Sequence, residues 1–68
     1  MMVDLHGKTH KEAEEAVIRA VEDNLNKKVM LSFVTGHSEK MKQVVLGVLQ
    51  EYGLQHSQLV DTRITAWV

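Results

Sequence analysis

Residues 29–38 read V-M-L-S-F-V-T-G-H-S, and this stretch decides the fold. The run Val29–Val34 is almost continuously apolar and contains β-branched and aromatic side chains, which is typical of a buried strand. We expect it to be a central strand that is covered on both faces, or nearly so. Gly36 interrupts the run, and Ser38 is a favourable helix N-cap. A strand that leads into a helix is therefore predicted.

The residues after Ser38 predict that helix and its end. Apolar side chains recur at helical spacing from Met41 to Tyr52. Gly53 stands where a left-handed C-terminal cap belongs, and Leu54 follows it to pack back on the helix.

The C-terminal part predicts two strands joined by a turn. Residues 59–60 fit a short strand, and residues 61–62 fit a turn. Residues 63–68 alternate polar and apolar side chains, which predicts a last strand that we expect at an edge of the sheet. Trp67 lies in this strand and is expected to cover the edge of the core, although a tryptophan can also stack on a base.

The N-terminal part predicts a strand followed by a capped helix. Met1–His6 has alternating apolar residues, and Gly7 breaks the pattern. Thr9 and Glu12 have the spacing of a capping box. The helix that follows, which ends near two asparagines, buries a narrow stripe of mostly small residues: Ala13, Ala16, Val17, Ala20, Val21 and Leu25.

The order of these elements predicts one α/β domain over residues 1–68. A strand–helix–strand connection favours parallel neighbours, and two helices cover only one face of a sheet well. We therefore expect a two-layer α/β sandwich of βαβαβ(β) order, with a mainly parallel sheet and both helices on one face. The chain has no cysteine, so packing has to stabilise the domain without disulfides or thiolate metal sites.

The composition disfavours several classes of function. The formal net charge of −1 argues against a strongly electrostatic nucleic-acid coat, although lysines and histidines flank both helix starts as a local basic rim. The four histidines lack the paired spacing of a structural zinc site. Apolar runs are far shorter than the ~20 residues of a membrane span, and no segment resembles a signal peptide. We therefore expect a cytoplasmic protein without a membrane partner.

Two polar loops are expected to meet at one end of the sheet. Ligands of open α/β sheets bind beyond the carboxyl ends of parallel strands. Asp4 and His6 end the first strand and project together in an extended segment, as an acid–imidazole pair able to transfer protons. The T-G-H-S of residues 35–38 ends the second strand. Both loops lead into helix N-termini, which favour an anion such as a phosphate.

The candidate site residues fall into two sets. The catalytic candidates are Asp4, His6 and His37. The candidates for binding phosphate or nucleic acid are Gly7, Lys8, Thr9, Thr35, Gly36, Ser38 and Lys40. The structural alternative is that these residues only end strands, form turns and cap helices. The remaining histidines are expected in solvent, and the side chains expected in the core include Phe33, Tyr52, Met30 and Met41.

Two motifs carry a resemblance to a known family. Val3–Thr9 reads V-D-L-H-G-K-T, and the family opens with a strand that ends in L-D-L-H-G. Val34–Ser38 reads V-T-G-H-S, and the family's second strand ends in H-G-x-G or T-G-x-G, often followed by H-S. A later helix and a closing strand correspond to Met41–Tyr52 and the C-terminal alternation. Over essentially its whole length, the chain resembles the Smr domain, the small MutS-related domain.

The resemblance implies a βαβαββ sandwich that binds nucleic acid and has endonuclease activity on DNA or RNA. It implies a role for Asp4 and His6, and phosphate contacts for Thr35 and Gly36. This chain lacks the family's second loop glycine, and Thr35 stands where some members have a histidine. A shorter loop offers fewer backbone N–H groups and no second imidazole, so binding without cleavage stays open.

We therefore predict a nucleic-acid-directed endonuclease that nicks DNA or cleaves RNA. His6 would act as general base or acid, Asp4 would orient its imidazole or bind substrate, and His37 would supply a second proton transfer. No cofactor is expected; a divalent metal on Asp4 and His6 stays open, with only two ligands to hold it. The alternatives are a non-catalytic DNA- or RNA-binding module and a small protein–protein adaptor. The adaptor would be a homodimer formed through the last strand, or would bind a larger protein.

Overall fold

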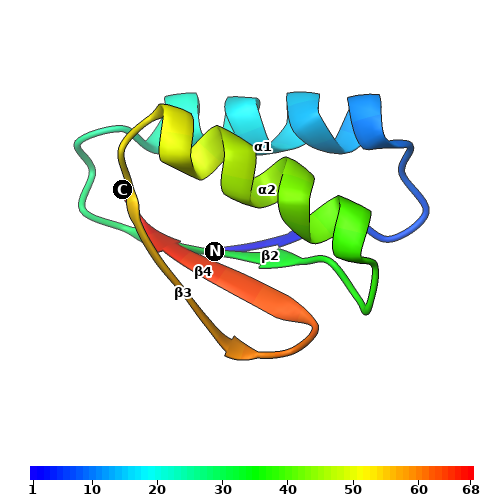
Figure 1. The fold of residues 1–68 in the computed structure, drawn as a ribbon. Helices are drawn as coiled ribbons and strands as arrows, with labels where there is room; N and C mark the ends of the chain where they lie inside the picture. Colours follow the sequence, from blue (N-terminus) through cyan, green and yellow to red (C-terminus); the bar gives the residue numbers. More distant parts are fainter.

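The elements follow one another as βαβαββ in the computed structural model, which describes residues 1–68 apart from the side chain of Leu59. Their bounds are β1 (Met2–Asp4), α1 (His10–Asn24), β2 (Met30–Val34), α2 (Glu39–Glu51), β3 (Gln55–Val60) and β4 (Arg63–Trp67). The strands form one sheet in the order β1-β2-β4-β3. Both helices lie over the same face of this sheet, which gives the expected two-layer α/β arrangement (Figure 1).

The sheet is mixed, so the expectation of a mainly parallel sheet is wrong. β1 and β2 pair in parallel, whereas β4 runs antiparallel to both of its neighbours, β2 and β3. The turn at residues 61–62 is the reason, because so short a connection joins antiparallel strands only. β4 enters the sheet between β2 and β3 and is not an edge strand. β4 therefore has no free edge through which a second copy of the chain could pair.

The capping box expected at the start of α1 is present. The Thr9 hydroxyl accepts a hydrogen bond from the Glu12 N–H at 3.1 Å, and the Glu12 carboxylate accepts one from the Thr9 N–H at 2.9 Å. These hydrogen bonds with Thr9 hold the pKa of Glu12 below its ordinary value. The fully buried apolar residues of the helix are Ala13, Val17 and Val21. Leu25, expected in the same stripe, lies beyond the last helical residue and is exposed.

The second helix, α2, also begins and ends as the sequence predicts. The Ser38 hydroxyl accepts a hydrogen bond from the Met41 N–H at 3.2 Å. Gly53 has a left-handed φ of 67°, and beyond it the Leu54 N–H donates to the Leu49 carbonyl at 3.0 Å, which closes the helix. Within the described part of the chain, no helix is both long and apolar enough to cross a membrane.

The core lies between the two helices and the face of the sheet that they cover. The sheet and the end of β1 contribute the fully buried side chains of Leu5, Leu31, Phe33, Ile64 and Ala66. α2 contributes Met41, as expected, together with Val45, Val48 and Leu49. Tyr52, expected in the core, is half-buried and donates its hydroxyl hydrogen bond to the Glu22 carboxylate at 2.8 Å.

The opposite face of the sheet has no helix over it (Figure 1). Met30 is 51% exposed and Trp67 is 43% exposed on that side. Three expectations are therefore wrong: that residues 29–34 are covered on both faces, that Met30 belongs to the core, and that Trp67 covers the edge of the core. The physical reason is that two helices cover one face of a four-stranded sheet and leave the other in solvent.

Candidate functional site

The first two loops meet at one end of the sheet because β1 and β2 are parallel neighbours. The Leu5 N–H donates to the Val34 carbonyl at 3.1 Å, so the chain leaves both strands side by side. The turn between β3 and β4 lies at the same end. Its Thr62 carbonyl accepts hydrogen bonds from the N–H groups of Thr35 at 2.9 Å and Gly36 at 3.2 Å. We call this end of the sheet, residues 4–9, 35–38 and 61–62, the rim.

Asp4 and His6 both lie at the rim, but their contact differs from the one that strand alternation predicts. β1 ends at Asp4, and the Asp4 carboxylate accepts a hydrogen bond from the backbone N–H of His6 at 2.8 Å. Gly7 follows with a left-handed φ of 78° and turns the chain toward Thr9. Asp4 thus stabilises a backbone turn rather than orienting the imidazole of His6, which lies exposed.

A hydrogen-bonded acid–imidazole pair is formed instead by His37 and Asp61, which we call the His–Asp pair. His37 Nδ1 lies 2.8 Å from Asp61 Oδ2. Lys42 Nζ lies 3.0 Å from Oδ1 of the same carboxylate and 3.4 Å from Glu39 Oε1. Lys42 is only 5% exposed, whereas the side chains of His37 and Asp61 are 80% and 66% exposed. The buried Lys42 ammonium therefore contacts one oxygen of the exposed Asp61 carboxylate, and the other oxygen contacts the exposed imidazole of His37.

The charges of this cluster fix the hydrogen-bonding role of His37. The contact with Lys42, and next the contact with His37, lowers the pKa of the Asp61 carboxyl, and the contact with Asp61 raises the pKa of Lys42. Asp61 is therefore ionised at neutral pH, and an ionised carboxylate only accepts hydrogen bonds. The Nδ1 of His37 has to donate, which leaves the lone pair of Nε2 free in the neutral imidazole.

The backbone N–H groups of the second loop already donate hydrogen bonds within the protein. The N–H groups of Thr35 and Gly36, predicted to contact a phosphate, both donate to the Thr62 carbonyl. The Thr35 hydroxyl donates to the same carbonyl at 3.3 Å, and Thr35 is buried. This segment attaches the turn between β3 and β4 to the end of β2, and it thereby brings Asp61 to His37.

The other residues predicted to bind phosphate stand at the two helix starts. The hydroxyls of Thr9 and Ser38 cap α1 and α2, so each already accepts a backbone hydrogen bond. Lys8 and Lys40 are exposed beside these caps. Their ammonium groups and the helix starts attract an anion, whereas the carboxylates that are hydrogen-bonded at the same end oppose one.

Sequence reasoning missed three residues at this site: Lys42, Asp61 and Arg63. The sequence indicates Lys42 only as one of the lysines that flank the start of the second helix, and Asp61 only as a turn residue. Arg63 pairs with Val34 and so begins β4 at the same end of the sheet. No local signal in the sequence identifies them, because the antiparallel insertion of β4 is what brings Asp61 and Arg63 to the rim.

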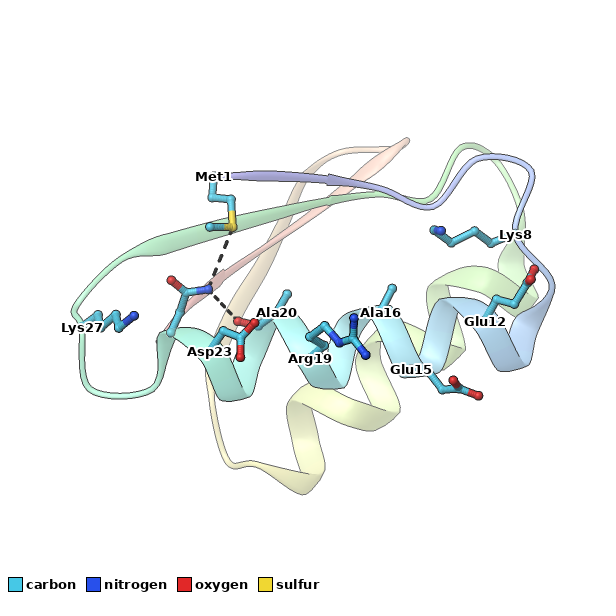
Figure 2. A pocket seen from close by; sticks show the side chains of 10 residues that line it. Met1, Lys8, Glu12, Glu15, Ala16, Arg19, Ala20, Asp23 and Lys27 are labelled. Carbon is cyan, nitrogen blue, oxygen red and sulfur yellow. Dashed lines mark hydrogen bonds between the residues drawn. The ribbon is translucent and has the colours of Figure 1, made fainter.

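A groove of about 590 Å³ runs between β1 and α1 (Figure 2). Lys8 lies toward one end of it, Arg19 lies along α1, and Met1 lies toward the other end. Beside Met1, the Asn24 amide donates to the Ala20 carbonyl at 2.7 Å. Lys8 is the one residue that lines this groove and also belongs to the predicted site, and the His–Asp pair lies outside it.

Within the described residues, no three histidine, aspartate or glutamate side chains gather as a group that could hold a metal ion. Comparison of the chain with protein-family models, with curated proteins and with solved structures finds no match. The resemblance to the Smr domain therefore stays a prediction that depends on the two motifs and on the order of the elements.

Proposed function

We propose that this domain is an endonuclease that cleaves phosphodiester bonds of nucleic acid at the rim. The observation that carries the proposal is the 2.8 Å contact between His37 and Asp61, with Lys42 bound to the same carboxylate. An imidazole whose tautomer is fixed by an ionised carboxylate is well suited to act as a general base. The side chain of His37 is 80% exposed, so a polynucleotide reaches Nε2 from solvent.

RNA allows the simplest reaction at this site. His37 Nε2 takes the proton of a 2′-hydroxyl, whose oxygen bonds to the adjacent phosphorus while the bond from phosphorus to the 5′-oxygen breaks. The leaving 5′-oxygen takes a proton from the protonated imidazole of His6, the other exposed histidine of the rim loops. The products are a 2′,3′-cyclic phosphate and a 5′-hydroxyl end, so atoms and protons balance.

Cations at the rim would stabilise the charge that develops on the phosphoryl oxygens. Lys8 and Lys40 are exposed beside the two helix starts, and Arg63 begins β4 next to the turn that carries Asp61. Fixed donors and helix N-termini directed at developing charge account for a large part of many enzymes' rate enhancement. The acids Asp4, Glu39 and Asp61 are all hydrogen-bonded within the protein, which limits their repulsion of a phosphate.

The order of the elements supports the same proposal. The chain has βαβαββ order, which is the order that the resemblance to the Smr domain implies. The D-L-H-G segment lies at the rim, as that resemblance would require. The proposal changes the roles of the residues: Asp61 rather than Asp4 orients an imidazole, and His37 rather than His6 is the general base.

The test is cleavage of a labelled oligoribonucleotide by the full chain and by His37→Ala. We expect the rate to fall by roughly 10²- to 10⁴-fold in His37→Ala, which is the usual contribution of a general base. Asp61→Asn is expected to lower the rate less, because the imidazole remains. His56→Ala is the matched control, since His56 is an exposed histidine of β3 that pairs with Ala66, away from the rim.

Equal cleavage by the wild type and His37→Ala would contradict the proposal and indicate a contaminating nuclease. A substrate with a 2′-deoxy group at the cleaved position tests the nucleophile. Cleavage that stops with this substrate supports the 2′-hydroxyl. Cleavage that continues and still depends on His37 assigns the attack to water and extends the substrate class to DNA.

One observation favours the second candidate, a non-catalytic binding module. The N–H groups of Thr35 and Gly36 are used by the Thr62 carbonyl, so they cannot stabilise a transition state unless the turn moves. Binding of nucleic acid with no cleavage in the same experiment would select this candidate.

A further inference from the structure

The face of the sheet that no helix covers carries exposed apolar side chains. Met2 is 60% exposed, Met30 51%, Val60 53% and Trp67 43%. Met30 and Trp67 are partners across β2 and β4, and each adjoins a buried residue in its strand, so both point away from the helices. We call this surface, formed by the outward side chains of the four strands, the open face. Apolar side chains gathered on one exposed face make this face a candidate binding surface.

Hydroxyl groups lie among these apolar side chains. Ser32, Thr65 and Ser57 are partners across β2, β4 and β3, and all three are half-buried. The hydroxyls of Ser32 and Thr65 lie 3.5 Å apart. A hydroxyl donates and accepts hydrogen bonds, so this row can pair with the edges of a base while the Trp67 ring stacks on the face of a base.

The size of the open face distinguishes between two candidate partners, a second copy of the chain and a single strand of nucleic acid. Four strands of three to six residues, about 4.8 Å apart and rising about 3.3 Å per residue, give an area of roughly 300 Å². A stable protein–protein interface buries about 800 Å² on each partner, more than twice this area. An aromatic side chain on an exposed sheet face with hydroxyl neighbours matches the chemistry that binds unpaired bases.

We infer that the open face binds single-stranded nucleic acid, with a base stacked on Trp67 and the strand running along β4 toward Arg63 and the rim. Trp67 and Arg63 are four residues apart in β4, about 13 Å. That distance is about four nucleotides at the stacked spacing of about 3.4 Å. The inference rests on the proposed function and narrows its substrate to unpaired strands, since a duplex keeps its base faces stacked inside.

The chain contains one tryptophan, so the fluorescence of Trp67 reports on the open face directly. The experiment titrates His37→Ala, in which cleavage is expected to be at least about 100-fold slower, with an oligouridylate of about ten nucleotides, and compares it with an RNA duplex of the same length. We expect the single strand to quench Trp67 fluorescence and to bind more tightly than the duplex.

Variants of Trp67 provide the second measurement, made by anisotropy of a labelled oligouridylate. We expect Trp67→Ala to weaken binding on the order of 10- to 100-fold, as loss of one stacked base does, and Trp67→Phe to weaken it less. Leu25→Ala is the matched control, because Leu25 is an exposed apolar residue beyond α1 and away from the open face. Circular dichroism verifies that each variant folds.

Several results would overturn the inference: unchanged Trp67 fluorescence, wild-type affinity in Trp67→Ala, or tighter binding of the duplex. Dimers that form without nucleic acid and disappear in Trp67→Ala would assign the open face to a second copy. The two proposals fail separately. Cleavage that depends on His37 without a response of Trp67 retains the endonuclease and removes this inference. A Trp67 response without any wild-type cleavage retains the binding of single strands by the open face and removes the endonuclease.

Discussion

Asp61 connects three parts of the molecule through one residue. Its carboxylate contacts Lys42 of α2 and His37 of the loop before that helix, and its backbone carbonyl accepts a hydrogen bond from the Gln58 side chain at 3.1 Å. The residue therefore affects both the stability of the turn and the orientation of the imidazole. A substitution of Asp61 is therefore expected to change both the free energy of unfolding and the rate of the proposed cleavage.

The pH dependence of unfolding tests the Asp61 contacts. The pKa of Asp61 is lowered in the folded state, so its stabilising effect is present above the unfolded pKa of about 3.9 and is lost as pH falls through the folded pKa. We expect the wild type to be more stable than Asp61→Asn at neutral pH, and this difference to shrink below about pH 4. Urea denaturation at several pH values measures the difference.

The control for that experiment repeats the comparison in a Lys42→Gln background. Contact with Lys42 is the largest cause of the lowered Asp61 pKa, so the pH-dependent part of the difference should be much smaller there. A difference between wild type and Asp61→Asn that grows as the pH falls would contradict the assignment.

The His–Asp pair shows why the candidate site could be predicted only in part. His37 belongs to a local T-G-H-S pattern that precedes a helix, so the sequence indicates its position at the end of a strand. Asp61 is 24 positions away and becomes its partner only because Thr62 pairs with Thr35 and Gly36. Asp4 and His6 are close in sequence, but β1 ends at Asp4 and the chain turns there. The two side chains therefore do not have the arrangement that a continued strand would give them.

Two glycines, one inside α2 and one just beyond its end, have opposite structural roles, which substitutions by alanine should reveal. Gly53 has a left-handed φ of 67°, so Gly53→Ala is expected to destabilise the protein by about 1–2 kcal/mol. Gly47 lies exposed inside α2 with no atom within 4 Å of an added Cβ, so Gly47→Ala should stabilise it by about 0.5–1 kcal/mol. Thermal or urea unfolding of both variants measures these changes, and a shift of the same sign in both would contradict this account.

The helices could be predicted more completely than the sheet because their signals are local. Thr9 with Glu12, Ser38, and Gly53 with Leu54 each specify a helix end within a few residues, and all of them do so in the structure. Strand order depends on partners distant in the chain. The alternation of residues 63–68 indicates a strand with one buried side, but it contains no information on which neighbours that strand has.

At the scale of the whole molecule, the small core makes stability sensitive to a single large side chain. Phe33 is a fully buried residue of β2. Phe33→Ala is expected to cost about 3–5 kcal/mol. A chain of 68 residues has a total stability of only about 3–10 kcal/mol, so this substitution removes a large part of it.

Met30→Ala is the matched control for Phe33→Ala, because Met30 lies in the same strand and points to solvent. Its free energy of unfolding should change by at most about 1 kcal/mol. Far-UV circular dichroism during urea titration compares the variants. A loss of stability in Met30→Ala equal to that in Phe33→Ala would mean that the open face is buried in solution.

The insertion of β4 between β2 and β3 has a consequence for how the chain acquires its structure. β2 and β3 are not paired in the sheet, so a nascent chain that ends before residue 63 has no partner for β3 and leaves one side of β2 unpaired. The sheet closes only when β4 emerges and takes the middle position. Folding of the domain is therefore expected to wait until β4 has been synthesised, and a fragment without β4 exposes strand edges that promote aggregation.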